Sequence, residues 1–201
     1  MNIRQLWARQ NIPPTIQDAA SGAQAAFALG RQHHQSGNLA DAERQYREAL
    51  AIDPKHADSM HLLGVAAIHT GRPEMAIDMI RKAIAINGTI GKYHSNLGNV
   101  LAAQGQLDEA VDCYRRAILL DPDLPETQNN LANALRQRSQ LDEAVIHYRR
   151  AIGLKPDFME AHFNLANTLK LLVARVAHIA GYSRFSLTRA SAVVNCQSAL
   201  A

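Results

Sequence analysis

Apolar and small side chains return at helical spacing along most of the chain, and the whole pattern repeats every 34 residues. The segment LDEAVDCYRRAILLDPD at residues 107–123 returns as LDEAVIHYRRAIGLKPD at residues 141–157, with thirteen of seventeen positions identical. Repetition at a fixed period of about 20–50 residues is typical of stacked supersecondary units. A 34-residue frame fits four full repeats and one partial repeat, at residues 23–56, 57–90, 91–124, 125–158 and 159–170.

The residues at each position of the frame predict a helical hairpin. Leucine occupies the seventh position of every repeat, glycine or alanine the eighth, and alanine the twentieth and twenty-seventh positions of the four full repeats. The twenty-fourth position is bulky, at Tyr46, Ile80, Tyr114 and Tyr148. Large side chains at helical spacing form an apolar stripe, and small ones let two helices approach closely. Glycine at the fifteenth position and proline near the end, each in three repeats, predict where the two helices stop.

The succession of leucine and a small residue, alanine, tyrosine, alanine and proline at these positions resembles the tetratricopeptide repeat. The resemblance implies an all-α fold, a right-handed superhelical solenoid of helix-turn-helix hairpins. Two residues depart from the pattern. Gly88 stands where the final proline is expected, so we expect a looser turn after the second repeat, and Ser139 replaces the turn glycine of the fourth repeat.

Composition and charge fit a helical array and argue against nucleic acid as a partner. The chain of 201 residues is 47% hydrophobic and 5% aromatic, which suits a fold rich in alanine and leucine. Its formal net charge is +3, but residues 171–201 hold three arginines and no acidic residue, which leaves 18 basic and 18 acidic side chains in residues 1–170. A nucleic-acid-binding face needs a basic stripe, and the repeats have no basic excess to supply one.

The sequence predicts a protein of a reducing compartment, the cytoplasm, with no membrane partner. Residues 1–22 contain no apolar run that would act as a signal sequence, and no stretch approaches the roughly 20 apolar residues of a membrane span. The two cysteines, Cys113 and Cys196, do not form the framework of a disulfide-rich fold.

No catalytic or metal-binding pattern is found among the residue types that usually supply one. The acidic pairs at residues 108–109 and 142–143 begin second helices, where they complement the helix dipole. His61 and His69 lie eight residues apart, about 12 Å along a helix, which is too far for one metal ion. Phosphate-binding loops, zinc-protease pairs and nucleophile elbows are missing. We therefore expect no catalytic residue, no metal ligand and no cofactor.

Both ends of the chain fall outside the frame. Residues 1–22 form either a leader or a short capping helix over residues 4–10, anchored by Trp7 and ended by Pro13 and Pro14. Residues 171–201 lose both the acidic residues and the repeat register. They are either a divergent basic cap for the last hairpin or the product of an interrupted reading frame, and helical spacing continues through Val176 and Ala177 to a possible stop at Gly181.

Paired asparagines on the first helices are the candidate binding residues. The sixth and ninth positions share one face of a helix. In the last three repeats these positions hold Asn96, Asn99, Asn130, Asn133, Asn164 and Asn167, which we call the asparagine row. The row resembles the asparagine ladder of the O-linked N-acetylglucosamine transferase repeats, and the resemblance implies that it holds an extended peptide backbone. Neighbouring side chains expected to add specificity are Asn129, Phe163 and Arg136.

Two functions follow from this interpretation. The first is a non-catalytic scaffold that binds a peptide or protein partner in its concave groove, with partner identity and oligomeric state undetermined. The second is the substrate-recognition region of a transferase of the ladder-bearing kind, or of another repeat-fused transferase, separated from its catalytic domain. A neighbouring coding segment for a nucleotide-sugar-binding domain would favour the second.

Overall fold

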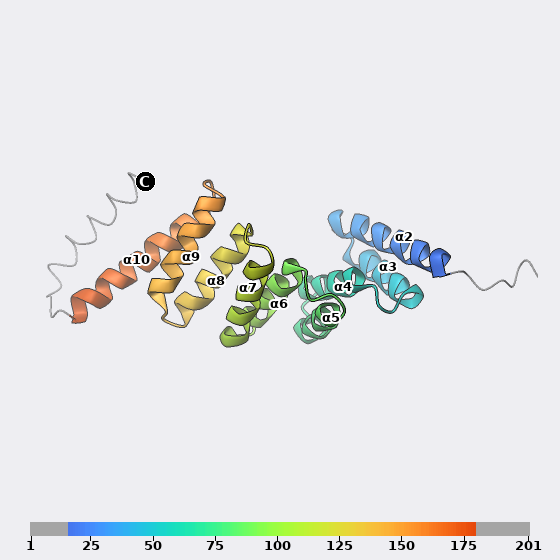
Figure 1. The fold of residues 1–201 in the computed structure, drawn as a ribbon, viewed down its shortest axis with the longest axis horizontal. Coiled ribbons are helices and arrows are strands. Elements are labelled where there is room, and N and C mark those ends of the chain that lie inside the picture. The colour runs from blue at the N-terminus through green and yellow to red at the C-terminus, as the bar shows by residue number, and fades with distance from the viewer. Residues whose placement is uncertain (1–15, 180–201) are drawn as a thin grey trace, which may run out of the picture. The chain divides into compact units, whose positions relative to one another are not determined.

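The fold consists of helices connected by short turns. The computed structural model describes residues 16–179, and these contain no β-strand, which confirms the all-α prediction. The helices are α2 (Ile16–Gln35), α3 (Leu39–Ile52), α4 (Ala57–His69), α5 (Pro73–Ile86), α6 (Gly91–Ala103), α7 (Leu107–Leu120), α8 (Pro125–Gln137), α9 (Leu141–Leu154) and α10 (Met159–Ile179) (Figure 1).

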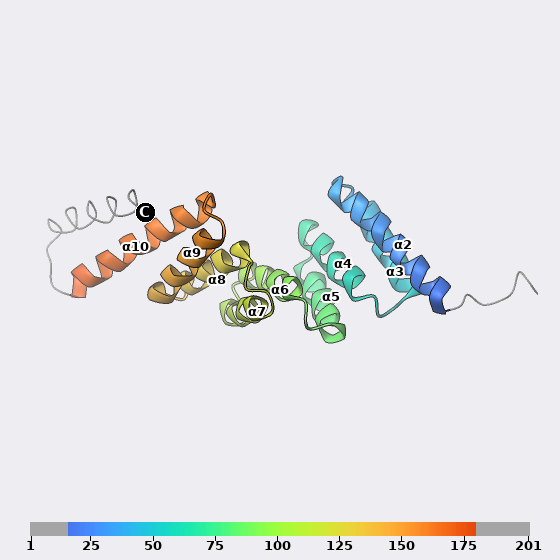
Figure 2. The ribbon, with the colours of Figure 1, turned by 45° about the horizontal axis from the view of Figure 1, so that its top comes forward.

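The described part of the chain, residues 16–179, divides into two compact units, one on each side of the boundary between Gly88 and Thr89. The division falls at Gly88, the residue that replaces the expected proline. In the first unit α2 packs against α3, α3 against α4 and α4 against α5 (Figure 2). In the second unit each helix from α6 to α10 packs against the next, and the first helices of successive hairpins also touch, α6 against α8 and α8 against α10. Each unit is therefore a stack of helical hairpins.

The small and bulky positions of the frame meet inside each hairpin. A Cβ atom added to Gly98 on α6 would lie 2.7 Å from the Tyr114 ring on α7, and one added to Gly64 on α4 would lie 2.7 Å from Ile80 on α5. Tyr114 is 2% exposed, and the alanines at the twentieth and twenty-seventh positions are all fully buried. Close helix contact thus explains why these positions hold small residues, as the sequence predicted.

The turns inside the hairpins share one backbone geometry. Gly37, Gly71 and Gly105 have φ values of 79°, 71° and 75°, and Ser139 has a φ of 62° at the same place in the fourth repeat. The amide of the residue immediately before the next helix donates back to the preceding helix and closes the turn; an example is the bond from Gln140 N to the Leu135 carbonyl oxygen, at 2.9 Å. The fourth hairpin therefore keeps the turn despite its non-glycine residue.

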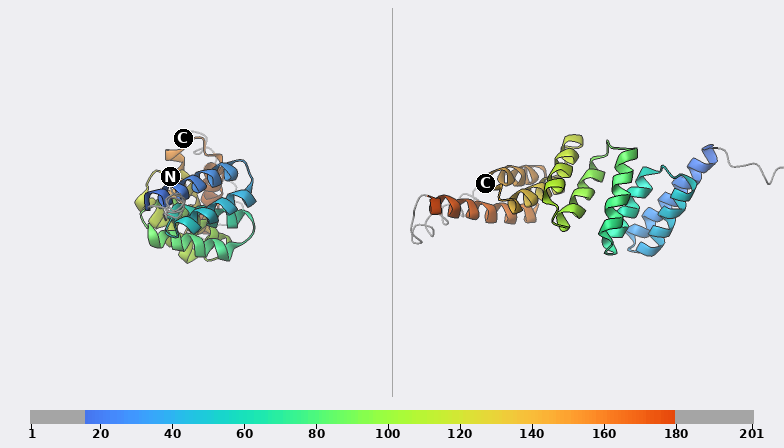
Figure 3. Two further views of the ribbon diagram at one scale, coloured as in Figure 1. Left: turned by 90° about the vertical axis from the view of Figure 1, so that its right-hand side faces the viewer. Right: turned by 90° about the horizontal axis from the view of Figure 1, so that it is seen from below.

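The fifth repeat departs from the frame, because its first helix does not turn where the others do. Helix α10 runs to Ile179, nine residues beyond the boundary placed at Lys170. It continues past the N-terminal end of α9, which runs antiparallel to it (Figures 1 and 3). The fifteenth position holds Val173 instead of glycine, and a β-branched residue strongly disfavours a positive φ. Arg175 Nη2 lies 2.8 Å from Asp142 Oδ2 at the start of α9, so this extension is tied to the repeat body. The predicted stop at Gly181 lies outside the described residues.

The first helix also extends beyond the frame. Helix α2 begins at Ile16, so part of the segment assigned to a separate leader is continuous with the first repeat. The capping helix expected over residues 4–10, with Trp7, lies outside the described residues.

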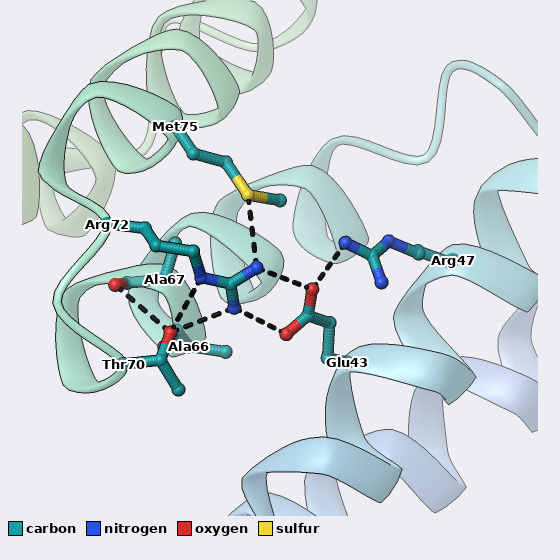
Figure 4. A network of polar contacts seen from close by, with 7 residues as sticks. All are labelled: Glu43, Arg47, Ala66, Ala67, Thr70, Arg72 and Met75. Carbon is teal, nitrogen blue, oxygen red and sulfur yellow. Dashed lines mark hydrogen bonds and ion pairs between the residues drawn. The ribbon is translucent and has the colours of Figure 1, made fainter.

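A polar network joins the two hairpins of the first unit. Figure 4 shows Arg72, just before α5, reaching Glu43 on α3. The two contacts are Nη1 to Oε1 at 3.0 Å and Nη2 to Oε2 at 2.5 Å, while Arg47 also pairs with this carboxylate. Thr70 Oγ1 accepts a bond from Arg72 Nε at 3.0 Å. The hydrogen bond from Arg72 holds the pKa of Glu43 below its ordinary value, so the buried carboxylate stays charged.

Candidate carboxamide binding surface

The asparagine row lies on the first helices of the second unit: α6, α8 and α10. Asn99 is exposed, and the other five side chains are half-buried. Because α6 touches α8 and α8 touches α10, carboxamides of successive repeats are brought together. The structure joins Asn99 with Asn130, and Asn133 with Asn164. Asn96 and Asn167 stand at the two ends of the row.

Each joined pair is completed by a buried tyrosine from the second helix of the earlier hairpin. Tyr114 Oη donates to Asn99 Oδ1 at 2.9 Å, and Asn130 Nδ2 donates to the same oxygen at 2.9 Å. We call these residues the first triad. The hydroxyl is on α7, so the triad links α6, α7 and α8 at one oxygen atom.

The second triad repeats this arrangement one hairpin later. Tyr148 Oη donates to Asn133 Oδ1 at 2.6 Å, and Asn164 Nδ2 donates to that oxygen at 3.1 Å. Burial raises the pKa of both Tyr114 and Tyr148, so both hydroxyls stay protonated and able to donate at neutral pH. The asparagines are therefore structural contacts between hairpins as well as surface groups.

One of the three predicted neighbours is placed wrongly by the sequence. Asn129 is 1% exposed, and its Nδ2 donates to Glu160 Oε1 at 3.0 Å, so its side chain offers no surface to a partner. Asn129 directly precedes Asn130 on α8, and its side chain faces α10, where Glu160 lies. Phe163 is 67% exposed on α10, and Arg136 is half-buried on α8.

Other buried polar contacts in the second unit were not predicted from the sequence. Ser95 Oγ and Thr127 Oγ1 are 2.8 Å apart between α6 and α8, where both residues are buried. His147 Nδ1 lies 2.8 Å from Gln128 Oε1 between α9 and α8. Desolvation lowers the pKa of His147, which favours the neutral ring at pH 7. These residue types are common on surfaces, so the sequence alone did not mark them as buried.

The tyrosines were predicted only as core residues, although the sequence carries a signal for their second role. Tyrosine at the twenty-fourth position coincides with asparagine at the ninth in the third and fourth repeats. In the second repeat Ile80 coincides with Val65, and neither can form such a bond. In the first repeat, where Arg31 replaces the asparagine, Tyr46 Oη instead lies 3.3 Å from His34 Nδ1.

Within residues 16–179, no cluster of three or more histidine, cysteine or acidic side chains is arranged to hold a metal ion. Over the same residues, no helix combines the length and apolar character needed to cross a membrane.

Stacked helical hairpins with a 34-residue period define a repeat protein, and the family models identify which one. The model described as tetratricopeptide repeat matches residues 23–87, and the model described as TPR repeat matches residues 98–137 and 132–172. The chain belongs to the tetratricopeptide repeat family.

Two human relatives match parts of the chain. Tetratricopeptide repeat protein 7B of Homo sapiens is 38% identical over 64 residues, which cover 32% of this chain and 8% of that protein. Tetratricopeptide repeat protein 7A of Homo sapiens is 34% identical over 89 residues, covering 42% of this chain and 10% of that protein. The matches thus extend over a tenth or less of the length of these curated relatives.

Solved structures of similar fold include MamA, YrrB and an O-GlcNAc transferase. MamA is 20% identical with a TM-score of 0.67, over 86% of this chain and 98% of that chain. YrrB, described as a TPR protein with an unusual peptide-binding site, is 21% identical with a TM-score of 0.65, over 83% of this chain and 82% of that one. A mutant O-GlcNAc transferase from Thermobaculum terrenum is 29% identical with a TM-score of 0.60, over 66% of this chain and 26% of that chain.

Proposed function

We propose that the chain is a non-catalytic scaffold that holds an extended peptide segment of a partner protein against α6, α8 and α10. The observation that carries the proposal is the asparagine row, whose side chains reach the surface from three adjacent helices. A carboxamide has both a donor and an acceptor, so it can pair with a backbone amide without recognising a particular side chain. The likeness to YrrB, described as having a peptide-binding site, is consistent with this use.

The spacing of the helices suits an extended backbone. Packed helices are separated by about 8–10 Å, and an extended chain advances about 3.3 Å per residue, so roughly three residues span one helix-to-helix step. Each hydrogen bond contributes about 0.5–1.5 kcal/mol net. Several asparagines together therefore matter where one alone has little effect.

Side chains beside the row are proposed to supply preference among peptides. Phe163 exposes most of its ring on α10, where an apolar side chain of the partner can pack. Arg136 on α8 offers a positive charge. Binding by the asparagine row itself should tolerate many peptide sequences, because every peptide has backbone amides.

The test compares two sets of carboxamide-to-alanine changes. Asn96→Ala, Asn130→Ala and Asn164→Ala are combined in one variant. The matched control combines Gln104→Ala, Gln106→Ala and Gln137→Ala, which remove exposed carboxamides near the turns. The probe is the tightest single peptide selected by the wild-type chain from a random 15-residue library. Fluorescence anisotropy should show at least tenfold weaker binding for the asparagine variant and wild-type binding for the control.

The asparagine variant should also be less stable than the wild type. Asn130 and Asn164 donate bonds between hairpins, so removing them should lower stability by about 1–3 kcal/mol. Binding is therefore measured well below the melting temperature, with helical content checked by circular dichroism. Wild-type affinity in a folded asparagine variant would refute the proposal.

A second proposal places these repeats in the substrate-recognition part of a longer transferase. Its support is the 29% identity to an O-GlcNAc transferase over 26% of that chain. A coding segment for a nucleotide-sugar-binding domain joined to these repeats would favour it, and sugar transfer by the purified chain alone would refute the non-catalytic assignment.

We further propose a cytoplasmic location, without cofactor, nucleic-acid or membrane partner, on the grounds of charge and cysteine content.

A further inference from the structure

The triads fix which end of each carboxamide faces away from its neighbours. The oxygen of Asn99 accepts from both Tyr114 and Asn130, and the oxygen of Asn133 accepts from both Tyr148 and Asn164. A carbonyl oxygen has two lone pairs, so both are occupied. The amino groups of Asn99 and Asn133 take no part in these bonds. Asn130 and Asn164 donate amino hydrogens, and Asn164 Nδ2 also lies 3.4 Å from Asn129 Oδ1, so the oxygens of Asn130 and Asn164 are not used within the triads.

The buried hydroxyls are what make this orientation definite. A flipped Asn99 would present its amino group to Tyr114, and the hydroxyl hydrogen, in a side chain only 2% exposed, would need another acceptor. A buried polar hydrogen without an acceptor is costly. In the second triad Tyr148 is fully buried and its Oη lies 2.6 Å from Asn133 Oδ1, so the same argument fixes the orientation of Asn133.

We propose that Tyr114 and Tyr148 are positioning residues for peptide binding, and this inference rests on the proposed function. They orient the row so that Asn99 and Asn133 donate to peptide carbonyl oxygens while Asn130 and Asn164 accept from peptide N–H groups. Donors and acceptors thus alternate from α6 to α10. The preferred ligand is an extended segment that keeps its N–H groups, so proline is disfavoured where the segment faces Asn130 or Asn164.

Isosteric aspartate substitutions distinguish the two kinds of asparagine. Asn99→Asp with Asn133→Asp keeps an oxygen for each tyrosine and each neighbouring asparagine, but replaces the outward amino group with a carboxylate oxygen. We expect a melting temperature close to wild type and at least tenfold weaker binding of the selected peptide. Asn130→Asp with Asn164→Asp places an oxygen against the oxygen of Asn99 or Asn133, yet keeps an outward acceptor. We expect a lower melting temperature and a smaller loss of affinity.

Removing only the hydroxyls tests the positioning role directly. Tyr114→Phe with Tyr148→Phe retains both rings in the core, and binding should weaken about three- to tenfold in protein that remains folded. Side-chain amide NMR signals of Asn99 and Asn133 should shift when peptide binds the wild type and should change in the phenylalanine variant without peptide. A merely structural role would not give a peptide-dependent signal. N-methylation of the peptide nitrogen opposite Asn130 should weaken binding to the wild type.

The outcomes separate the inference from the proposed function. If the asparagine-to-alanine variant binds peptide normally, both fail. If that variant loses binding while the two aspartate variants behave alike, or while the phenylalanine variant binds as wild type, the orientation is wrong and the peptide-binding function stands. The inference is supported by three results together. Asn99→Asp with Asn133→Asp loses affinity but keeps its melting temperature, Asn130→Asp with Asn164→Asp loses melting temperature with a smaller loss of affinity, and the phenylalanine variant binds peptide more weakly.

Discussion

Ser139 holds a backbone conformation that glycine holds in the other three turns, and replacing it should stabilise the protein. Its φ of 62° lies in the left-handed region, which costs an L-residue about 1–2 kcal/mol. Glycine loses about 0.5–1 kcal/mol more backbone entropy on folding, which offsets part of the gain. Ser139 is exposed, so little packing is lost with its side chain. We expect Ser139→Gly to stabilise the chain by about 0.5–1 kcal/mol.

The reverse change at the equivalent position is the matched control. Gly105 has a φ of 75°, and an added Cβ would meet nothing within 4 Å, so Gly105→Ser should destabilise by a similar amount through the backbone alone. Urea unfolding followed by circular dichroism measures both changes. In thermal melts each kcal/mol corresponds to roughly 2–4 °C for a chain of this size. The reasoning is refuted if both variants shift the midpoint in the same direction.

Three further changes probe packing and titration. Ala110→Leu should cost about 1–3 kcal/mol in a urea melt because Ala110 is fully buried between helices, whereas Leu119→Ala, at a residue 71% exposed, should change little. Because the pKa of Glu43 is lowered, its contribution to stability is present above the ordinary value of 4.5 and is lost as pH falls. The free energy of unfolding should therefore decrease less on acidification in Glu43→Gln than in the wild type. Because the pKa of His147 is also lowered, the unfolded state binds more protons below 6.5, and His147→Asn should lose less stability than wild type between pH 7 and 5.

The fold was predictable because the frame encodes packing residue by residue. A small eighth position and a bulky twenty-fourth position are in contact within a hairpin, as Gly98 and Tyr114 show, so the period alone locates the core. Departures from the frame were harder to interpret. The acidic residues and the repeat register are lost after Lys170, and helical spacing alone indicated that the helix continues, as it does to Ile179. A missing stop signal lengthens a helix, and the frame cannot say by how much.

The placement of the asparagine row on one helix face was predictable, and its hydrogen bonds were not. Helical spacing places the sixth and ninth positions on one face, but it does not show that the two positions bond to each other across repeats, as Asn130 does to Asn99. That bond depends on the offset between neighbouring hairpins, which only the packed structure supplies. Tyr114 satisfies its hydroxyl at this same oxygen, so a core residue and a surface row are joined in one network. Where the ninth position holds no asparagine, the twenty-fourth position has a different solution: Ile80, which needs no acceptor, in the second repeat, and Tyr46 beside His34 in the first.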